Sequence, residues 1–181
     1  MDTPTPAFLN EDVIDPRTLL KQAGVSAGMT VAAFGVGHNL VLLMAASELV
    51  TSTGIVYAMD VMKEVLRLAQ EKADSVGAAN IVTLWTDLEI YGAARRVIDG
   101  SVDVGVLVNT LFQSSSRADM IRECVRMIKT GGTLLVVDWK PQQTAIGPTV
   151  AQRVQPAEMK QLAAENHLVV AEEFEAGEYH W

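Results

Sequence analysis

The sequence predicts an α/β fold in which a mostly parallel, doubly wound sheet carries helices on both faces. Strand-like apolar runs alternate with helical patterns along the chain, which is typical of such a sheet. The run at residues 101–110 (SVDVGVLVNT) is almost continuously apolar, as expected of a strand covered on both faces. A chain of 181 residues suits one domain. We therefore expect a flexible tail at residues 1–10 and a single domain over residues 11–181.

The individual elements follow from capping residues and hydrophobic spacing. The first helix is expected at residues 15–24, because Asp15 can cap it, Pro16 suits its first position and Gly24 its end. Further helices are predicted at residues 39–50, which are apolar almost all round, and at residues 61–78, where apolar residues recur at helical spacing. Two more are predicted at residues 117–132 and 156–167. The strands are predicted at residues 28–37, 54–60, 80–87, 101–110, 133–139 and 168–177.

Composition excludes several classes of function. The 14 basic and 22 acidic residues give a net charge of −8, which is poorly suited to nucleic acid or an anionic membrane surface. The single cysteine, Cys124, excludes a disulfide framework and a multi-cysteine zinc site, and no metal is expected. The N-terminus lacks the features of a signal peptide, and the apolar run at residues 41–50 is too short to span a bilayer. These features predict a soluble, cytoplasmic protein.

Residues that follow the predicted strands are the candidates for a ligand site, because ligands of such sheets bind at the carboxyl ends of strands. Gly35 and Gly37 follow the first strand, where glycine lets backbone approach a ligand. Asp60 ends the second strand 23 residues after Gly37, which is the place of a ribose-binding acid in nucleotide-binding sheets. Each feature has a structural alternative: a plain turn for the glycines, and a helix cap for Asp60 or for Asp87 after the third strand.

In this order the features resemble the class I S-adenosylmethionine-dependent methyltransferases, most closely those that act on small molecules. The resemblance runs from about Phe8 to the C-terminus. Its pieces are GMTVAAFGVG, GIVYAMD, LWTDLE, SVDVGVLVNTLF and VRMIKTGGTLLVVDWKP, of which the last is the most specific. The resemblance implies a Rossmann-like sheet, S-adenosylmethionine as cofactor and a small-molecule substrate. It does not identify a catalytic residue.

The resemblance also implies roles around the first two strands. Gly35, Val36 and Gly37 would line the methionine and ribose part of the cofactor. Asp60 would bind the ribose hydroxyls, and Val61 and Met62 would lie against the adenine.

Further roles are implied after the third and fourth strands. Asp87 would meet the adenine amino group, and Leu88 would pack on the ring. Asn109 and the two residues after it would border the methionine end and the transferred methyl group.

The first motif departs from the family pattern at two positions. An acidic residue usually stands two places before the first glycine, where this chain has Ala33, and a third glycine usually stands where it has Asn39. The preceding His38 is also bulkier than usual. Losing one charge-assisted hydrogen bond costs about 1.5–3 kcal/mol, or roughly ten- to a hundredfold in affinity. A second interpretation is therefore a non-catalytic binding or assembly module with weakened cofactor binding.

The C-terminus is a further departure, because the family's seventh strand runs antiparallel after the sixth and little of the chain remains for it. Tyr179 to Trp181 could begin that strand, so we expect it to be shortened or absent. An exposed sheet edge would favour a homodimer.

A third interpretation, an NAD-dependent dehydrogenase, is disfavoured. Leu40 stands where its third glycine would fall, and the sequence has no Tyr-x-x-x-Lys pair. Asp138, after the fifth strand, could be a base, a substrate anchor or a loop cap.

Overall fold

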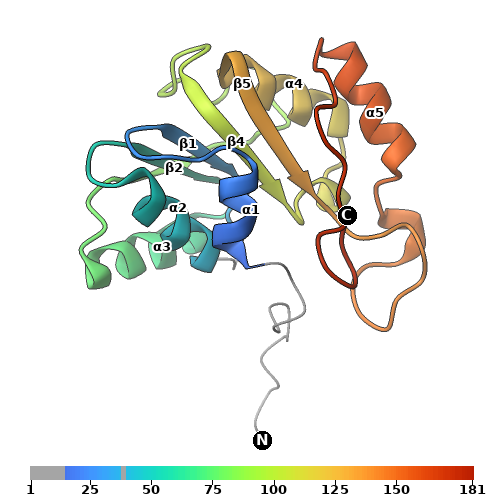
Figure 1. Cartoon of the computed structure of the whole chain (residues 1–181), viewed down its shortest axis with the longest axis horizontal. Helices are drawn as coiled ribbons and strands as arrows, with labels where there is room; N and C mark the ends of the chain where they lie inside the picture. The colour runs from blue at the N-terminus through green and yellow to red at the C-terminus, as the bar shows by residue number, and fades with distance from the viewer. Residues whose placement is uncertain (1–14, 38–39) are drawn as a thin grey trace, which may run out of the picture.

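The computed structural model describes residues 15–37 and 40–181. The predicted tail, and the predictions for His38 and Asn39, lie outside the described residues. At the centre is a five-stranded parallel sheet with the spatial order β3-β2-β1-β4-β5 (Figure 1). The strands are β1 (Thr30–Phe34), β2 (Ile55–Asp60), β3 (Ile81–Trp85), β4 (Val102–Val108) and β5 (Ile128–Val137). The sheet confirms the predicted fold class.

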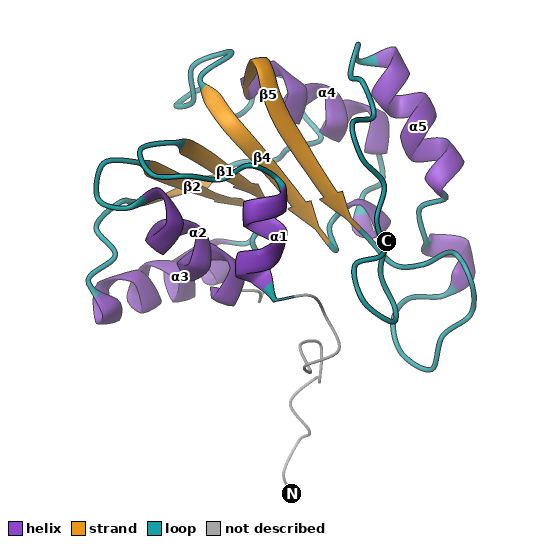
Figure 2. Cartoon of the chain, in the orientation of Figure 1, coloured by secondary structure: helices purple, strands orange, loops and turns teal. Residues whose placement is uncertain are grey.

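Helices cover both faces of the sheet (Figure 2). On one face lie α1 (Pro16–Gln22), α2 (Leu40–Val50) and α3 (Lys63–Val76). On the other face lie α4 (Arg117–Met127) and α5 (Pro156–Glu165). Two single 3₁₀ turns, η1 (Leu111–Gln113) and η2 (Val150–Gln152), precede α4 and α5. No helix in the described part of the chain is long and apolar enough to cross a membrane.

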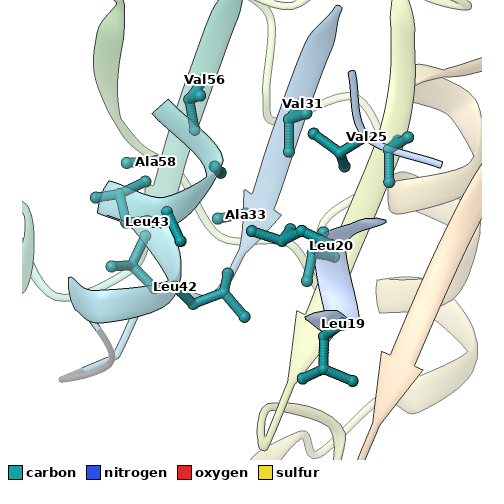
Figure 3. Packing of buried hydrophobic residues seen from close by; sticks show 14 of the residues in the cluster. Leu19, Leu20, Val25, Val31, Ala33, Leu42, Leu43, Val56 and Ala58 are labelled. Atoms are coloured by element: carbon teal, nitrogen blue, oxygen red, sulfur yellow. The ribbon is translucent and has the colours of Figure 1, made fainter. Parts of the chain in front are cut away.

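Each face of the sheet has its own apolar core. Under α1 to α3, Leu20 and Leu43 belong to the same buried cluster as Val31 of the first strand (Figure 3). On the opposite face, Phe34 and Met127 are fully buried among residues of α4 and α5. Burying a side chain of this size stabilises the fold by about 1.5–3 kcal/mol. The two cores hold the strand ends, and the turns that follow them, in fixed positions.

Two predicted boundaries are corrected where the fifth strand begins. The helix expected to reach residue 132 ends at Met127, and the strand expected from residue 133 begins at Ile128. Ile128 pairs with Val102 of β4, and Gly131 has a φ of +79°, which a helix does not accommodate. The pairing with β4 therefore overrides the helical hydrophobic pattern.

The predicted sixth strand at residues 168–177 is wrong. These residues form no strand, and Val169 is 90% exposed. A groove of about 1180 Å³ separates them from β5. The last residues instead pair antiparallel with the residues after β5: Trp139 bridges His180, and the Lys140 amide donates to the Tyr179 carbonyl at 2.8 Å. The predicted shortening of the seventh strand is thus confirmed.

Candidate functional site

The candidate site lies where the strand order reverses, between the carboxyl ends of β1 and β4. The chain leaves β1 toward β2 on one side and reaches β4 on the other, and ligands of such sheets bind at this switch in strand order. The register pairs Ala33 of β1 with Val106 of β4, so Gly35 and Val36 lie near the end of β4. These turns carry most of the residues that the sequence singled out.

The glycine turn after β1 is tied to the neighbouring strand. The amides of Gly35 and Val36 both donate to the Met59 carbonyl of β2, at 3.0 and 3.1 Å. Gly35 and Gly37 have φ values of +77° and +52°, a region that disfavours other residues. A Cβ on Gly37 would meet no atom of residues 15–37 or 40–181 within 4 Å, whereas one on Gly35 would collide with Thr110. The turn is therefore closed toward β4 at Gly35 and open at Gly37.

Asp60 anchors the open end of this turn. One carboxylate oxygen accepts from the Gly37 amide at 2.9 Å, and the other accepts from the Met62 amide at 2.8 Å. The carboxylate is 8% exposed, so water screens these bonds little. α3 begins at Lys63, with Met62 as its cap residue, so Asp60 supports the helix entry without being its N-cap. Each oxygen retains a lone pair for a further donor.

An exposed apolar shelf follows Asp60. Val61 is 58% and Met62 is 55% exposed, which is unusual for large apolar side chains beside a buried carboxylate. Trp85 at the end of β3 holds this shelf, because its indole N–H donates to the Val61 carbonyl at 2.9 Å. Sequence reasoning did not assign this role to Trp85, and no local pattern reveals it.

The predicted pair after β3 is split between surface and core. Asp87 is exposed, and its carboxylate accepts from the Glu89 amide at 2.9 Å, as in a turn cap. The Leu88 side chain is 5% exposed and packs in the core beneath α4 and α5. Thr86, which the sequence did not suggest, is buried, and its hydroxyl has no hydrogen-bond partner among the described residues. A buried hydroxyl without a partner at the carboxyl end of β3 is a candidate ligand contact.

Glu89 joins the loops after β3 and β4. It accepts from the Ser114 hydroxyl at 2.8 Å and from the Ser115 amide at 2.9 Å. A hydrogen bond from the Ser115 hydroxyl is the main cause that holds the pKa of Glu89 below its usual value. These bonds fix the outer frame of the site.

Asn109 and Thr110 close the site on the side of β4. Asn109 has a φ of +54°, its amide donates to the Val137 carbonyl at 2.9 Å, and its carbonyl accepts from Gln113 at 2.9 Å. Its side-chain oxygen is buried and has no partner in residues 15–37 or 40–181. The Thr110 hydroxyl lies 3.3 Å from the Phe34 carbonyl, across the gap between β4 and β1.

Among the described residues, no polar side chain lines the cavity at the place of the missing acid. Ala33 is 5% exposed and lines a cavity of about 10 Å³, room for roughly one water molecule. The rest of the lining is apolar or glycine: Gly35, Val36, Leu42, Leu43, Val106 and Val108. A carboxylate at this position would be buried against leucine and valine.

Asp138 is a loop cap rather than an accessible base. Its carboxylate is fully buried and accepts from the amides of Trp139 at 2.8 Å and Phe112 at 3.2 Å. Burial raises the pKa of Asp138 to about 6. Nearby His180 is 3% exposed, and burial, followed by the charges of Arg153 and Lys140, lowers its pKa to about 4.

No group of three or more His, Cys, Asp or Glu residues in the described ranges is placed to hold a metal.

Comparison with known proteins agrees with this geometry. A family model described as "Methyltransferase domain" matches residues 32–136, more than half of the chain. A SAM-dependent methyltransferase from Aquifex aeolicus is similar with a TM-score of 0.85 and 27% identity, over 97% of this chain and 90% of that one. A putative type 11 methyltransferase from Sulfolobus solfataricus has a TM-score of 0.69 and 23% identity, over 83% of this chain and 79% of that one.

A third similar structure shows that a shared fold does not by itself identify the reaction. The [4+2]-cyclase SpnF has a TM-score of 0.70 and 16% identity, over 83% of this chain and 54% of that one. At this identity the likeness concerns the fold only, and that fold supports more than one chemistry.

The site has the chemistry that a nucleoside with a charged amino-acid tail requires. Asp60 offers lone pairs to hydroxyl groups, the Val61–Met62 shelf offers an apolar surface, and the turn is open at Gly37. The unpartnered polar atoms of Thr86 and Asn109 lie at the ends of β3 and β4. The fit is incomplete at Ala33, and Leu88 packs in the core rather than at the surface. On the matched family model and the likeness to the Aquifex enzyme, the chain belongs to the methyltransferase domain family, with S-adenosylmethionine as its cofactor.

Proposed function

We propose that the chain transfers the methyl group of S-adenosylmethionine to a small molecule. The observation that carries the proposal is Asp60, which ties the glycine turn to the start of α3 and lies beside an exposed apolar shelf. We propose Gly35, Val36, Gly37 and the residues after each strand as the cofactor contacts, as the family resemblance implies.

The residues of the chain act by positioning the cofactor and the methyl acceptor. The bound cofactor supplies an electrophilic methyl group, and a well-oriented acceptor needs little covalent help. The turn and Asp60 hold one side of the site, and the Glu89 bonds to Ser114 and Ser115 hold the other. Asp138 is fully buried and both of its carboxylate oxygens accept hydrogen bonds from backbone amides, so it does not serve as the general base.

Charge supports a small acceptor over nucleic acid. The net charge of −8 repels a phosphate backbone. We further propose a cytoplasmic location and a single domain over residues 11–181, in line with the composition and length of the chain.

Methyl transfer can be tested with tritiated S-adenosylmethionine and an extract of small metabolites, followed by ultrafiltration. The proposal expects label in the filtrate, and less label with Asp60→Ala. Label retained only with macromolecules would contradict a small-molecule acceptor. Cofactor binding without any transfer, over a broad set of acceptors, would favour the non-catalytic module.

The free edge of β5 supports a second proposal, a homodimer. Within the described part of the chain, β5 pairs with β4 alone, and a mainly apolar groove lies along its other side, facing residues 168–175. Val169 and Val170 in that segment are exposed. An open edge next to exposed valines favours association with a second copy. Light scattering over a range of concentrations should give a dimer mass that Val169→Lys lowers; a monomer at every concentration would contradict the proposal.

A further inference from the structure

The arginines of the described chain fall into two groups by their partners. Some bond to carboxylates or, in one case, to backbone carbonyls: Arg17, Arg67, Arg117, Arg126 and Arg153. The guanidinium groups of Arg95, Arg96 and Arg122 are exposed and form no ion pair or hydrogen bond with residues 15–37 or 40–181. Acidic residues are in excess in a chain of net charge −8, so these three arginines mark a local surface of opposite sign.

The loop between β3 and β4 carries this surface and is fixed to α4. The Glu123 carboxylate of α4 accepts from the Gly92 amide at 2.7 Å and from the Ala94 amide at 3.1 Å. The guanidinium carbon of Arg122 lies 4.2 Å from the centre of the Tyr91 ring, which is a cation–π contact between helix and loop. The backbone that presents the arginines is therefore held in place.

Large apolar side chains are exposed on the same loop. Ile90 is 57% and Ile98 is 77% exposed. The basic surface is defined here as Ile90, Tyr91, Arg95, Arg96, Ile98 and Arg122. Arginine and aromatic residues are enriched in protein–protein interfaces, whereas a phosphate backbone offers no apolar partner for isoleucine. The basic surface therefore fits an acidic protein segment that also exposes apolar side chains.

The chain itself contains such a segment after α5. Residues 165–178, the acidic segment, include no Lys or Arg and five glutamates: Glu165, Glu172, Glu173, Glu175 and Glu178. Val169 and Val170 in this segment are 90% and 48% exposed. The Glu173 carboxylate lies 2.8 Å from the Lys160 ammonium group, and both side chains are more than half exposed. Surface pairs of this kind contribute only about 0–1 kcal/mol, so they can be exchanged for a new partner.

We propose that the acidic segment of one copy docks on the basic surface of a second copy. Within one chain, no hydrogen bond or ion pair of the described residues joins the two surfaces, and Glu172 instead accepts from Gln22 at 3.1 Å. In a two-fold dimer the contact forms twice, because each copy gives its own segment and receives the other's. The inference rests on the homodimer proposed above and names the surface that the exposed valines and glutamates meet.

Charge reversal tests the contact in trans. Arg95→Glu/Arg96→Glu makes both surfaces acidic, and Glu172→Arg/Glu173→Arg makes both basic. Either double variant alone should raise the dimer dissociation constant at least about a hundredfold in light scattering, because like charges that face each other across an interface are strongly unfavourable. An equimolar mixture of the two variants brings opposite charges together at both contacts, so it should form a mixed dimer with an affinity near that of the wild type.

The matched control is Lys63→Glu/Lys72→Glu. Both lysines are exposed and belong to α3, on the other face of the sheet, and their reversal changes the net charge by the same amount. This variant should dimerise like the wild type, and circular dichroism should show that every variant is folded.

Three outcomes would overturn the inference. A mixture that stays monomeric, or a single charge-reversed variant that dimerises like the wild type, would exclude the contact. A wild-type dimer that Val169→Lys disrupts and Arg95→Glu/Arg96→Glu leaves intact would keep the homodimer and exclude its docking on the basic surface. A wild-type protein that is monomeric at every concentration would refute both, and methyl transfer would be untouched by any of these results.

Discussion

The most quantitative prediction concerns Asp60, because two backbone amides depend on its carboxylate. Each bond, to Gly37 at 2.9 Å and to Met62 at 2.8 Å, joins an amide to a charged acceptor in a nearly buried place. Such bonds contribute about 1.5–3 kcal/mol each. Asp60→Asn keeps one acceptor oxygen and loses one bond, and Asp60→Ala loses both. We expect the free energy of unfolding to fall by about 2 kcal/mol for Asp60→Asn and by about 4 kcal/mol for Asp60→Ala. The larger loss is below the free energy of unfolding of a typical domain, about 5–15 kcal/mol.

Thermal unfolding followed by circular dichroism measures these losses. For a chain of this length, about 1 kcal/mol lowers Tm by roughly 2–4 °C, so the expected shifts are about 6 °C for Asp60→Asn and about 12 °C for Asp60→Ala. The matched control is Asp87→Asn, because Asp87 is exposed and accepts only one amide bond. Its Tm should fall by about 2 °C or less. An Asp60→Ala protein as stable as the wild type would refute the reasoning.

Three further predictions test the frame of the site. Glu123 is fully buried and accepts hydrogen bonds from two loop amides and from Arg126. Glu123→Ala should therefore lower the free energy of unfolding, measured by chemical denaturation, by about 3–5 kcal/mol. A loss below about 1 kcal/mol would contradict this. The pKa of Glu89 is lowered in the folded state, so the stability that this carboxylate contributes is present above the ordinary Glu pKa of about 4.3 and is lost as the pH falls below it. Glu89→Gln should therefore lose less stability on acidification than the wild type does. An unchanged dependence of stability on pH would exclude this role of Glu89. Gly35→Ala should lower Tm, because the new Cβ would collide with the Thr110 side chain. Adding Thr110→Ala, which removes the closest of the colliding atoms, should restore part of the lost Tm. A double variant no more stable than Gly35→Ala would argue against the interlock.

The sequence was most informative where local pattern and tertiary role coincide. Asp60 and the glycines could be placed because parallel strands bring their carboxyl ends to one edge, and the structure ties Gly37 to Asp60 there. The helix at Pro16 could be placed from its cap, and Asp15 accepts from the Thr18 amide as expected.

Prediction failed where long-range packing decides. Residues 168–177 have the apolar and polar composition of a strand, but their neighbour across the groove is too distant to pair. The helix at residue 117 ended early because Ile128 pairs with Val102. The interlock of Thr110 with Gly35 depends on two turns 75 residues apart in sequence. No local window contains that information.

Among the described residues, Ala33 weighs against tight binding of the cofactor. The cavity beside it is apolar, so Ala33 belongs to the core rather than to a polar cofactor loop. Binding must then rest on Asp60, the shelf at Val61 and Met62, and the turn after β4.

Isothermal titration calorimetry of the wild-type protein with S-adenosylhomocysteine tests this balance most directly. We predict saturable binding in the micromolar range with one site per chain, abolished by Asp60→Ala. An absence of heat with ligand at millimolar concentration would contradict it and would leave a methyltransferase fold without its cofactor.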